Sequence, residues 1–373
     1  MAYRVPLLAA LLLPALSLLA ACSGSDVDPE EGARTALAAG DYVVAREYLA
    51  AALKASPADP ELLELLARTR LGLGEGDATI ATLNRLATEG RLPADAALLY
   101  AEAELQRDAP EEAVKRLADD SSAPAWRIRA LAAVRQGDRE QAAHAFSAGT
   151  RAEGPKADLL VNYAYFLLED DDVPGARRIA NIALADSPKH IDTMLLDARI
   201  SQRELRNSAA LARYREILAS IPAHREALLG AISVLGAAGE LDEVQTLLAR
   251  GMENAPGDPE FIYISARLAA EKNDWVAVRR ILQQTEMSLA DFPEANSLYS
   301  QAMLEMGQAE QARARLVGLV RDDPENPMIR RLYARALMDL GDFAEARQAI
   351  EPLANMSGAT REDIDLYRRA SAN

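Results

Sequence analysis

A constant interval of 34 residues runs through this chain and constrains its fold more than any other feature. Seven units follow one another without a gap, and their first residues are Ala123, Ala157, Ile191, Arg225, Pro259, Pro293 and Pro327. A fixed period between roughly 20 and 50 residues is typical of solenoids, in which each repeat packs only against its neighbours. The sequence therefore predicts a repeat array rather than the two or three globular domains that 373 residues would otherwise suggest.

Small side chains recur at two positions of each unit, the eighth and the twentieth. The eighth position holds Ala33, Ala67, Ala101, Ala130, Ala164, Ala198, Ile232, Ala266, Ser300 and Ala334. The twentieth position holds Ala45, Thr79, Ala113, Ala142, Ala176, Ala210, Val244, Val278, Ala312 and Ala346. Because two antiparallel helices approach closely only where both present small side chains, these positions predict the contact within a helix hairpin.

Turn-forming residues separate the predicted helices at fixed offsets. Glycine followed by an acidic residue stands between the two helices of several units, at Gly40-Asp41, Gly137-Asp138, Gly239-Glu240 and Gly341-Asp342. Glycine can end the first helix and the acidic side chain can cap the second. Between units, proline recurs at Pro57, Pro188, Pro222, Pro256 and Pro324. Proline at this place ends the second helix and leaves room for the next unit to begin.

These alanines, Gly-Asp pairs and prolines resemble the tetratricopeptide repeat, over residues 27–373. The resemblance implies an all-α fold, a right-handed superhelical solenoid of about ten helix-turn-helix repeats with a C-terminal capping helix. Seven repeats in register occupy residues 123–359, and less regular repeats occupy residues 32–122, with units that start near Asp26, Pro60 and Ala94. The capping helix is expected within residues 360–373. The chain should then form one continuous solenoid.

The N-terminus indicates export and lipid attachment. Arg4 precedes an apolar stretch at residues 5–19 that is too short to span a membrane, so residues 1–21 are expected to be a signal peptide. Leu19-Ala20-Ala21-Cys22 looks like a bacterial lipobox, and Cys22 is the only cysteine of the chain. Residues 22–31 are expected to form the lipidated cysteine and a flexible acidic tether. The stretch resembles enterobacterial-type lipoproteins, and this resemblance implies that Ser23 after the cysteine directs the protein to the outer membrane, on its periplasmic side.

Composition and motifs argue against several function classes. The formal net charge of −16 disfavours nucleic acid and anionic lipid surfaces as partners. The three histidines, His144, His190 and His224, lie in different repeats without metal-ligand spacing, and no catalytic motif is present. The acidic run at residues 170–172 is best explained as a capping turn between helices. We therefore expect no enzymatic activity, cofactor, metal or small-molecule substrate.

The resemblance further implies that the first helix of each repeat lines a concave groove. The ninth position of the repeat, which points inward, holds Arg34, Arg68, Arg199, Arg267 and Arg335 among its ten residues. The expected partner-binding residues of the groove are Arg127, Arg135, Tyr165, Arg199, Arg203, Tyr263, Arg267, Arg331 and Arg335. Arginine and tyrosine suit an acidic or polar extended peptide. The competing interpretation is that the arginines only pair with acids four residues away on their own helix.

The repeat that starts at Arg225 departs from the pattern. Ile232 and Val244 replace the small residues at both contact positions, and Gly230, Gly236, Ala237 and Ala238 leave an uncharged inner wall. A flexible point and an apolar pocket are compatible with this pattern, and local repacking is the favoured interpretation.

The opening stretch suggests a more particular role. Residues 38–42, 51–54 and 92–94 resemble lipoproteins with tetratricopeptide repeats that accompany exosortase/PEP-CTERM exopolysaccharide loci. This resemblance implies a scaffold that binds protein partners in the cell envelope during exopolysaccharide assembly or export. The alternatives are an accessory lipoprotein for outer-membrane protein or pilus-secretin assembly, and an adaptor that regulates peptidoglycan hydrolases.

Overall fold

The computed structural model describes residues 28–38, 40–284 and 292–372, and within these ranges it contains 21 α-helices and no strand. The helices group into two compact units, residues 1–159 and 160–373, with the boundary inside α9. Each unit is described separately, so the single continuous solenoid stays a prediction.

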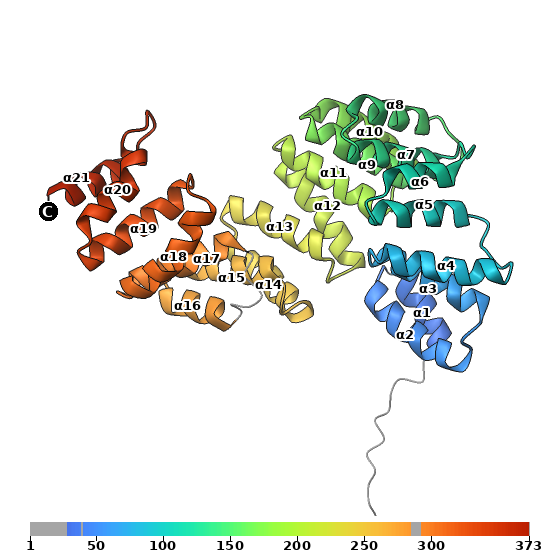
Figure 1. Ribbon diagram of the computed structural model, residues 1–373, viewed down its shortest axis with the longest axis horizontal. Helices are drawn as coiled ribbons and strands as arrows, with labels where there is room; N and C mark the ends of the chain where they lie inside the picture. Colours follow the sequence, from blue (N-terminus) through green and yellow to red (C-terminus); the bar gives the residue numbers. More distant parts are fainter. Residues whose placement is uncertain (1–27, 39, 285–291, 373) are drawn as a thin grey trace, which may run out of the picture. The chain divides into compact units, whose positions relative to one another are not determined.

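The first unit is a row of antiparallel hairpins (Figure 1). Its helices are α1 (Pro29–Ala38), α2 (Tyr42–Ala55), α3 (Pro60–Gly72), α4 (Gly76–Thr88), α5 (Ala96–Gln106), α6 (Pro110–Leu117), α7 (Ala123–Arg135) and α8 (Arg139–Gly149). Each odd-numbered helix packs against the even-numbered helix that follows it, and successive hairpins pack in chain order. Since α1 begins at Pro29, Glu30 and Glu31 form its first turn, and the predicted tether is wrong in its last three residues.

The second unit repeats this arrangement. Its helices are α9 (Ala157–Glu169), which crosses the boundary, α10 (Val173–Asp186), α11 (Ile191–Arg203), α12 (Asn207–Ser220), α13 (Arg225–Ala238), α14 (Leu241–Asn254), α15 (Pro259–Glu271), α16 (Trp275–Gln284), α17 (Pro293–Glu305), α18 (Ala309–Asp322), α19 (Pro327–Leu340), α20 (Phe343–Ala354) and α21 (Arg361–Ala372). From α7 on, every odd-numbered helix up to α19 begins at a predicted unit start. The final helix, α21, packs against α19 and α20.

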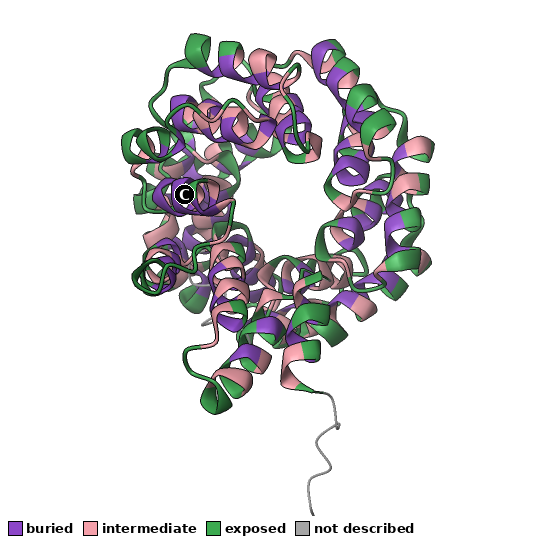
Figure 2. Cartoon of the chain, turned by 90° about the vertical axis from the view of Figure 1, so that its right-hand side faces the viewer, coloured by how far each residue is buried: buried purple, intermediate pink, exposed green. Residues whose placement is uncertain are grey.

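The two columns of small residues form the centre of each hairpin. Every residue of both columns is buried, with exposures from 0% at most positions to 4% at Ile232 and Val244. Figure 2 shows the result, with buried residues along one side of the helices and exposed residues along the other. The all-α fold of stacked helix hairpins that the period predicts is confirmed.

A left-handed residue at the fifteenth position of every repeat reverses the chain between its two helices. Its φ lies between 55° and 83°, and the ten residues are Gly40, Gly74, Asp108, Gly137, Asp171, Leu205, Gly239, Asn273, Gly307 and Gly341. Glycine, asparagine and aspartate enter this region at low cost. The next residue can cap the second helix, as Asp172 does by accepting a hydrogen bond from the Gly175 amide at 2.9 Å. The acidic run at residues 170–172 thus belongs to such a turn.

Leu205 is the exception among these turns, and replacing it by glycine should stabilise the protein. Its φ is 58°, which is sterically unfavourable for leucine, and its side chain is 85% exposed, so no buried contact offsets this strain. We expect Leu205→Gly to raise the free energy of unfolding by about 0.5–1 kcal/mol, measured by urea denaturation. The reverse change at the equivalent turn, Gly239→Leu, should lower it. A loss of stability in Leu205→Gly would contradict this explanation.

Candidate functional site

Cys22, the predicted lipidation site, lies outside the described residues. No helix in the described ranges is both long and apolar enough to cross a membrane. The predicted groove residues are all described, and they lie on the first helices of their repeats.

Two of them, Arg127 and Arg135, lie on α7 in the first unit. The Arg127 guanidinium forms an ion pair with Glu102 of α5, and its side chain is only 17% exposed. Arg135 lies 3.6 Å from Asp108 at the end of α5. Arg127 therefore joins adjacent repeats, and little of its surface is open to a partner.

Tyr165, Arg199 and Arg203 come together in the second unit, in a depression of about 620 Å³ between α9 and α11. Arg199 Nη1 donates to the Tyr165 hydroxyl oxygen at 2.9 Å, and the guanidinium carbon lies 5.4 Å from the centre of the tyrosine ring. Burial raises the pKa of Tyr165, so its hydroxyl keeps its proton and can still donate. Arg203 is 61% exposed, and its nearest carboxylate, Asp171, is 3.9 Å away.

Several arginines of the ninth position bridge consecutive repeats. Arg34 donates to Glu61, Arg68 to Asp95 and Arg199 to Glu226, each acceptor 27 residues further on, at the second position of the next repeat. The competing sequence interpretation also holds for two of them, because Glu30 pairs with Arg34 and Glu64 with Arg68 on the same helix. Such exposed pairs are worth roughly 0–1 kcal/mol each, so a partner can displace them.

Arg267 differs from these arginines. Among the described residues, no carboxylate oxygen lies within 4.0 Å of its nitrogens, neither Glu271 on its own helix nor Glu294 at the bridging position. Its guanidinium carbon lies 5.9 Å from the centre of the Tyr263 ring, and that ring packs edge-on against Phe292 at 5.2 Å. Arg267 also borders a cleft of about 730 Å³ between α13, α14 and α15.

Arg331 and Arg335 lie on α19 and have different partners. Arg331 donates two hydrogen bonds to Asp363 of α21, at 2.6 and 3.0 Å, and Asp363 is 1% exposed. Arg331 thus holds the capping helix. Arg335 pairs with Glu305 at 2.8 Å and borders a depression of about 350 Å³ between α19 and α21. Tyr165, Arg199, Arg203, Arg267 and Arg335, which all border depressions of the second unit, are called the arginine face below.

Comparison with known protein families decides what kind of chain this is. Two family models described as tetratricopeptide repeat match residues 36–93, 205–268 and 303–358, and residues 129–191, which together make up more than half of the chain. The chain belongs to the tetratricopeptide repeat family. A search of the curated proteins found no match.

Several solved structures match this chain at low sequence identity. A tetratricopeptide repeat protein from Parabacteroides merdae matches 67% of this chain and 98% of its own, with a TM-score of 0.51 and 15% identity. Yeast Tom70 covers 92% of this chain and 88% of its own, with a TM-score of 0.48 and 13% identity. Pseudomonas aeruginosa pilF covers 56% of this chain and 96% of its own, with a TM-score of 0.48 and 18% identity.

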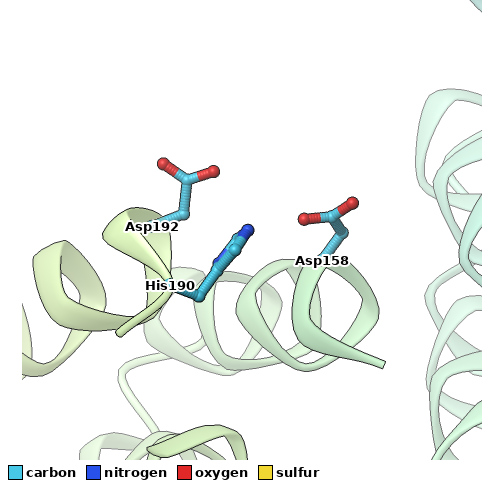
Figure 3. Close-up of side chains that lie close together, drawn as sticks. All are labelled: Asp158, His190 and Asp192. Atoms are coloured by element: carbon cyan, nitrogen blue, oxygen red, sulfur yellow. The ribbon is translucent and has the colours of Figure 1, made fainter. Parts of the chain in front are cut away.

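Within this tetratricopeptide array, sequence reasoning missed one group of side chains. Figure 3 shows Asp158 in the first turn of α9, His190 immediately before α11 and Asp192 in its first turn. One ligand atom from each lies within 4.8 Å of the others. The 34-residue period could have found the group, since Asp158 and Asp192 occupy equivalent positions. Both aspartates are exposed, and acidic surfaces gather such groups without a metal, so we derive no metal site from them.

The link between α19 and the tetratricopeptide capping helix should depend on pH. Hydrogen bonds from Arg331 lower the pKa of Asp363 to about 2 from its ordinary 3.8, against the opposing effect of burial. The resulting stability is complete above the unfolded-state pKa and is lost as the pH falls through 4 towards 2. The loss should reach about 2 kcal/mol, measured by hydrogen exchange of the α21 amides after correction for intrinsic rates.

Two variants separate this effect from general acid unfolding. Asp363→Asn should loosen α21 already at neutral pH and flatten its response between pH 5 and 2, near the pKa values of about 4 and 2. Asp365→Asn, on the same helix but 62% exposed, should behave like the wild type. An unchanged pH response in Asp363→Asn would exclude Asp363 as the titrating group.

Proposed function

We propose that this chain is a non-enzymatic adaptor of the cell envelope, held at the outer membrane by a lipid on Cys22 and facing the periplasm. Its arginine face would bind extended acidic or polar segments of protein partners that take part in exopolysaccharide assembly or export. The family supports the general part of this proposal, because tetratricopeptide arrays act as protein-binding scaffolds. The lipobox-like motif at residues 19–22 supports lipid attachment and the location at the membrane. The resemblance of residues 38–42, 51–54 and 92–94 supports the exopolysaccharide pathway.

One observation carries the binding proposal, namely that two arginines of the arginine face have no close carboxylate partner among the described residues. Arg203 is mostly exposed with a carboxylate only at 3.9 Å, and Arg267 has none within 4.0 Å among the described residues. Arg199 holds Tyr165 in place through one nitrogen and Glu226 through another. An incoming carboxylate can bind Arg203 and Arg267 directly and can exchange with Glu226 at Arg199. Charge-assisted bonds of this kind are short and directional but worth only roughly 0–1 kcal/mol each at so exposed a surface, so binding needs several of them together.

Photo-crosslinking in living cells tests this proposal. A photoreactive residue is placed at Leu168 or at Ser233, which line the two larger depressions, so that every arginine stays intact. The matched control is Val317 on α18, a second helix of its repeat, where the side chain is 51% exposed. We expect protein adducts at Leu168 and Ser233 that the Arg203→Ala, Arg267→Ala double variant loses, and none specific to Val317.

The identity of the adducts decides the pathway. Capture of exopolysaccharide synthesis or export proteins supports the full proposal. Capture of porin-assembly, secretin or peptidoglycan-hydrolase proteins would keep the adaptor and replace its pathway. Adducts confined to Val317, or adducts that do not depend on the arginines, would overturn the arginine face as the binding surface.

A further inference from the structure

The cleft beside Arg267 is mainly apolar. It lies between α13, α14 and α15, and its aliphatic walls are Leu229, Ile232, Leu241, Val244, Ile264 and Leu268. Its volume of about 730 Å³ falls within the range of roughly 300–1,000 Å³ that is typical of ligand clefts. Such a surface gains free energy when apolar side chains cover it.

The sequence of this repeat explains the cleft. Ile232 and Val244 stand at the two contact positions that other repeats fill with small residues, and both also line the cleft. Beyond them α13 ends in Gly236, Ala237 and Ala238, which contribute little or no side chain to fill the space. A Cβ atom added to Gly236 would meet no atom within 4 Å. Of the interpretations left open by the sequence, the structure agrees with the apolar pocket.

The charges around the cleft define what can bind there. Arg267 stands at the border without a carboxylate within 4.0 Å among the described residues. Glu260, at the same border, lies 3.3 Å from Arg225, which also pairs with Asp258 at 2.5 Å. Glu271 also borders the cleft, one helical turn after Arg267. An arginine that has no carboxylate within 4.0 Å among the described residues, next to an apolar wall, suits a ligand that offers both an apolar group and a carboxylate.

We infer that this cleft is a docking site for apolar side chains in an acidic segment of a partner polypeptide. The apolar side chains cover Leu229, Leu241 and Ile264, which are at least partly exposed, and a neighbouring aspartate or glutamate of the segment pairs with Arg267. The inference rests on the proposed function, because it specifies which sequences the arginine face accepts. An adaptor that recognised acidic charge alone would bind any acidic segment. This cleft would instead require a side chain of the size of leucine or phenylalanine beside the acidic residue.

Selection from a random peptide library on the purified chain tests the inference. The wild type should enrich peptides that place large apolar residues beside aspartate or glutamate. Gly236→Leu fills the cleft with a side chain that has open space to enter and that favours the helix, so the fold should persist. The matched control is Gly318→Leu on α18, where an added Cβ also meets no atom within 4 Å.

Each variant has its own expected outcome. Gly236→Leu should weaken binding of the enriched peptides about tenfold or more and remove the apolar preference, while Gly318→Leu leaves both unchanged. Arg267→Gln should keep the apolar preference and lose the acidic one. Acidic peptides that bind Gly236→Leu as well as the wild type, and that need Arg199 or Arg203, would overturn the cleft but keep the adaptor. Failure of every protein to enrich any peptide would count against both.

Discussion

Replacing Tyr214 by alanine is expected to lower the free energy of unfolding by about 3–5 kcal/mol, because a large and fully packed side chain is lost. Tyr214 on α12 is 2% exposed and lies against Gly230 of α13, where an added Cβ atom would come within 2.3 Å of its ring. The ring therefore fills a notch that only glycine leaves open. Without it, the contact between α12 and α13 would contain a cavity.

The hydroxyl group of Tyr214 provides the matched control. It donates a hydrogen bond to Gln202 Oε1 at 2.6 Å, and burial raises its pKa to about 12, so the group remains a neutral donor. Tyr214→Phe keeps the ring and should cost only about 1 kcal/mol. Urea denaturation followed by circular dichroism measures both variants, and hydrogen exchange in α12 and α13 locates the loss. An alanine variant within 1 kcal/mol of the phenylalanine variant would show that the notch repacks.

Replacing Asp197 by alanine should cost about 3 kcal/mol, through electrostatics rather than packing. The Asp197 carboxylate on α11 accepts hydrogen bonds from Arg177 of α10 at 2.5 Å and from Arg213 of α12 at 3.0 Å. The Asp197 and Arg177 side chains are only 14% and 17% exposed. Removing the shared acceptor breaks two hydrogen bonds to a charged and largely buried group, each worth about 1.5–3 kcal/mol. The cost stays near the lower end, because Arg177 keeps Glu204 as a partner and Arg213 keeps Glu216.

Two comparisons test the origin of this cost. Asp242→Ala, at an exposed site in the first turn of α14, should change the free energy of unfolding by no more than about 0.5 kcal/mol. In a double-mutant cycle, Arg213→Met should recover part of the loss in the Asp197→Ala background, because it removes one of the two cations that shared the Asp197 carboxylate. Purely additive effects would refute the electrostatic explanation.

The fold was predictable because its determinants recur. Residues such as Ala130 and Ala142 occupy fixed places in a 34-residue period, and the helices begin at the predicted residues from Ala123 on. Turns that end the first helix at glycine were predicted at Gly40, Gly137, Gly239 and Gly341. The positive φ of Asp108, Leu205 and Asn273 was not predicted, because these residue types do not reveal it in the sequence. Repetition thus identifies a conformational constraint even where the residue type does not.

The surface was less predictable, because the state of a side chain depends on its neighbours in space. The positions of Tyr165, Arg199 and Arg203 in one depression follow from the repeat register. The pairing of Arg199 with Glu226 was not predicted, because Glu226 lies 27 residues further on in the next repeat and not four residues away on the same helix. Arg331 was expected in the groove, but its partner Asp363 belongs to the capping helix, where the register no longer applies.

The arginine bridges between repeats have a mechanical meaning. A repeat array behaves as a chain of neighbouring links, and each bridge strengthens one of them. Among the described residues, Arg267 has no carboxylate within 4.0 Å, so no such bridge joins α15 to α17 there. A bound segment that supplies a carboxylate to Arg267 would strengthen this junction. The second unit would then be stiffer around α15 with a partner bound than without one.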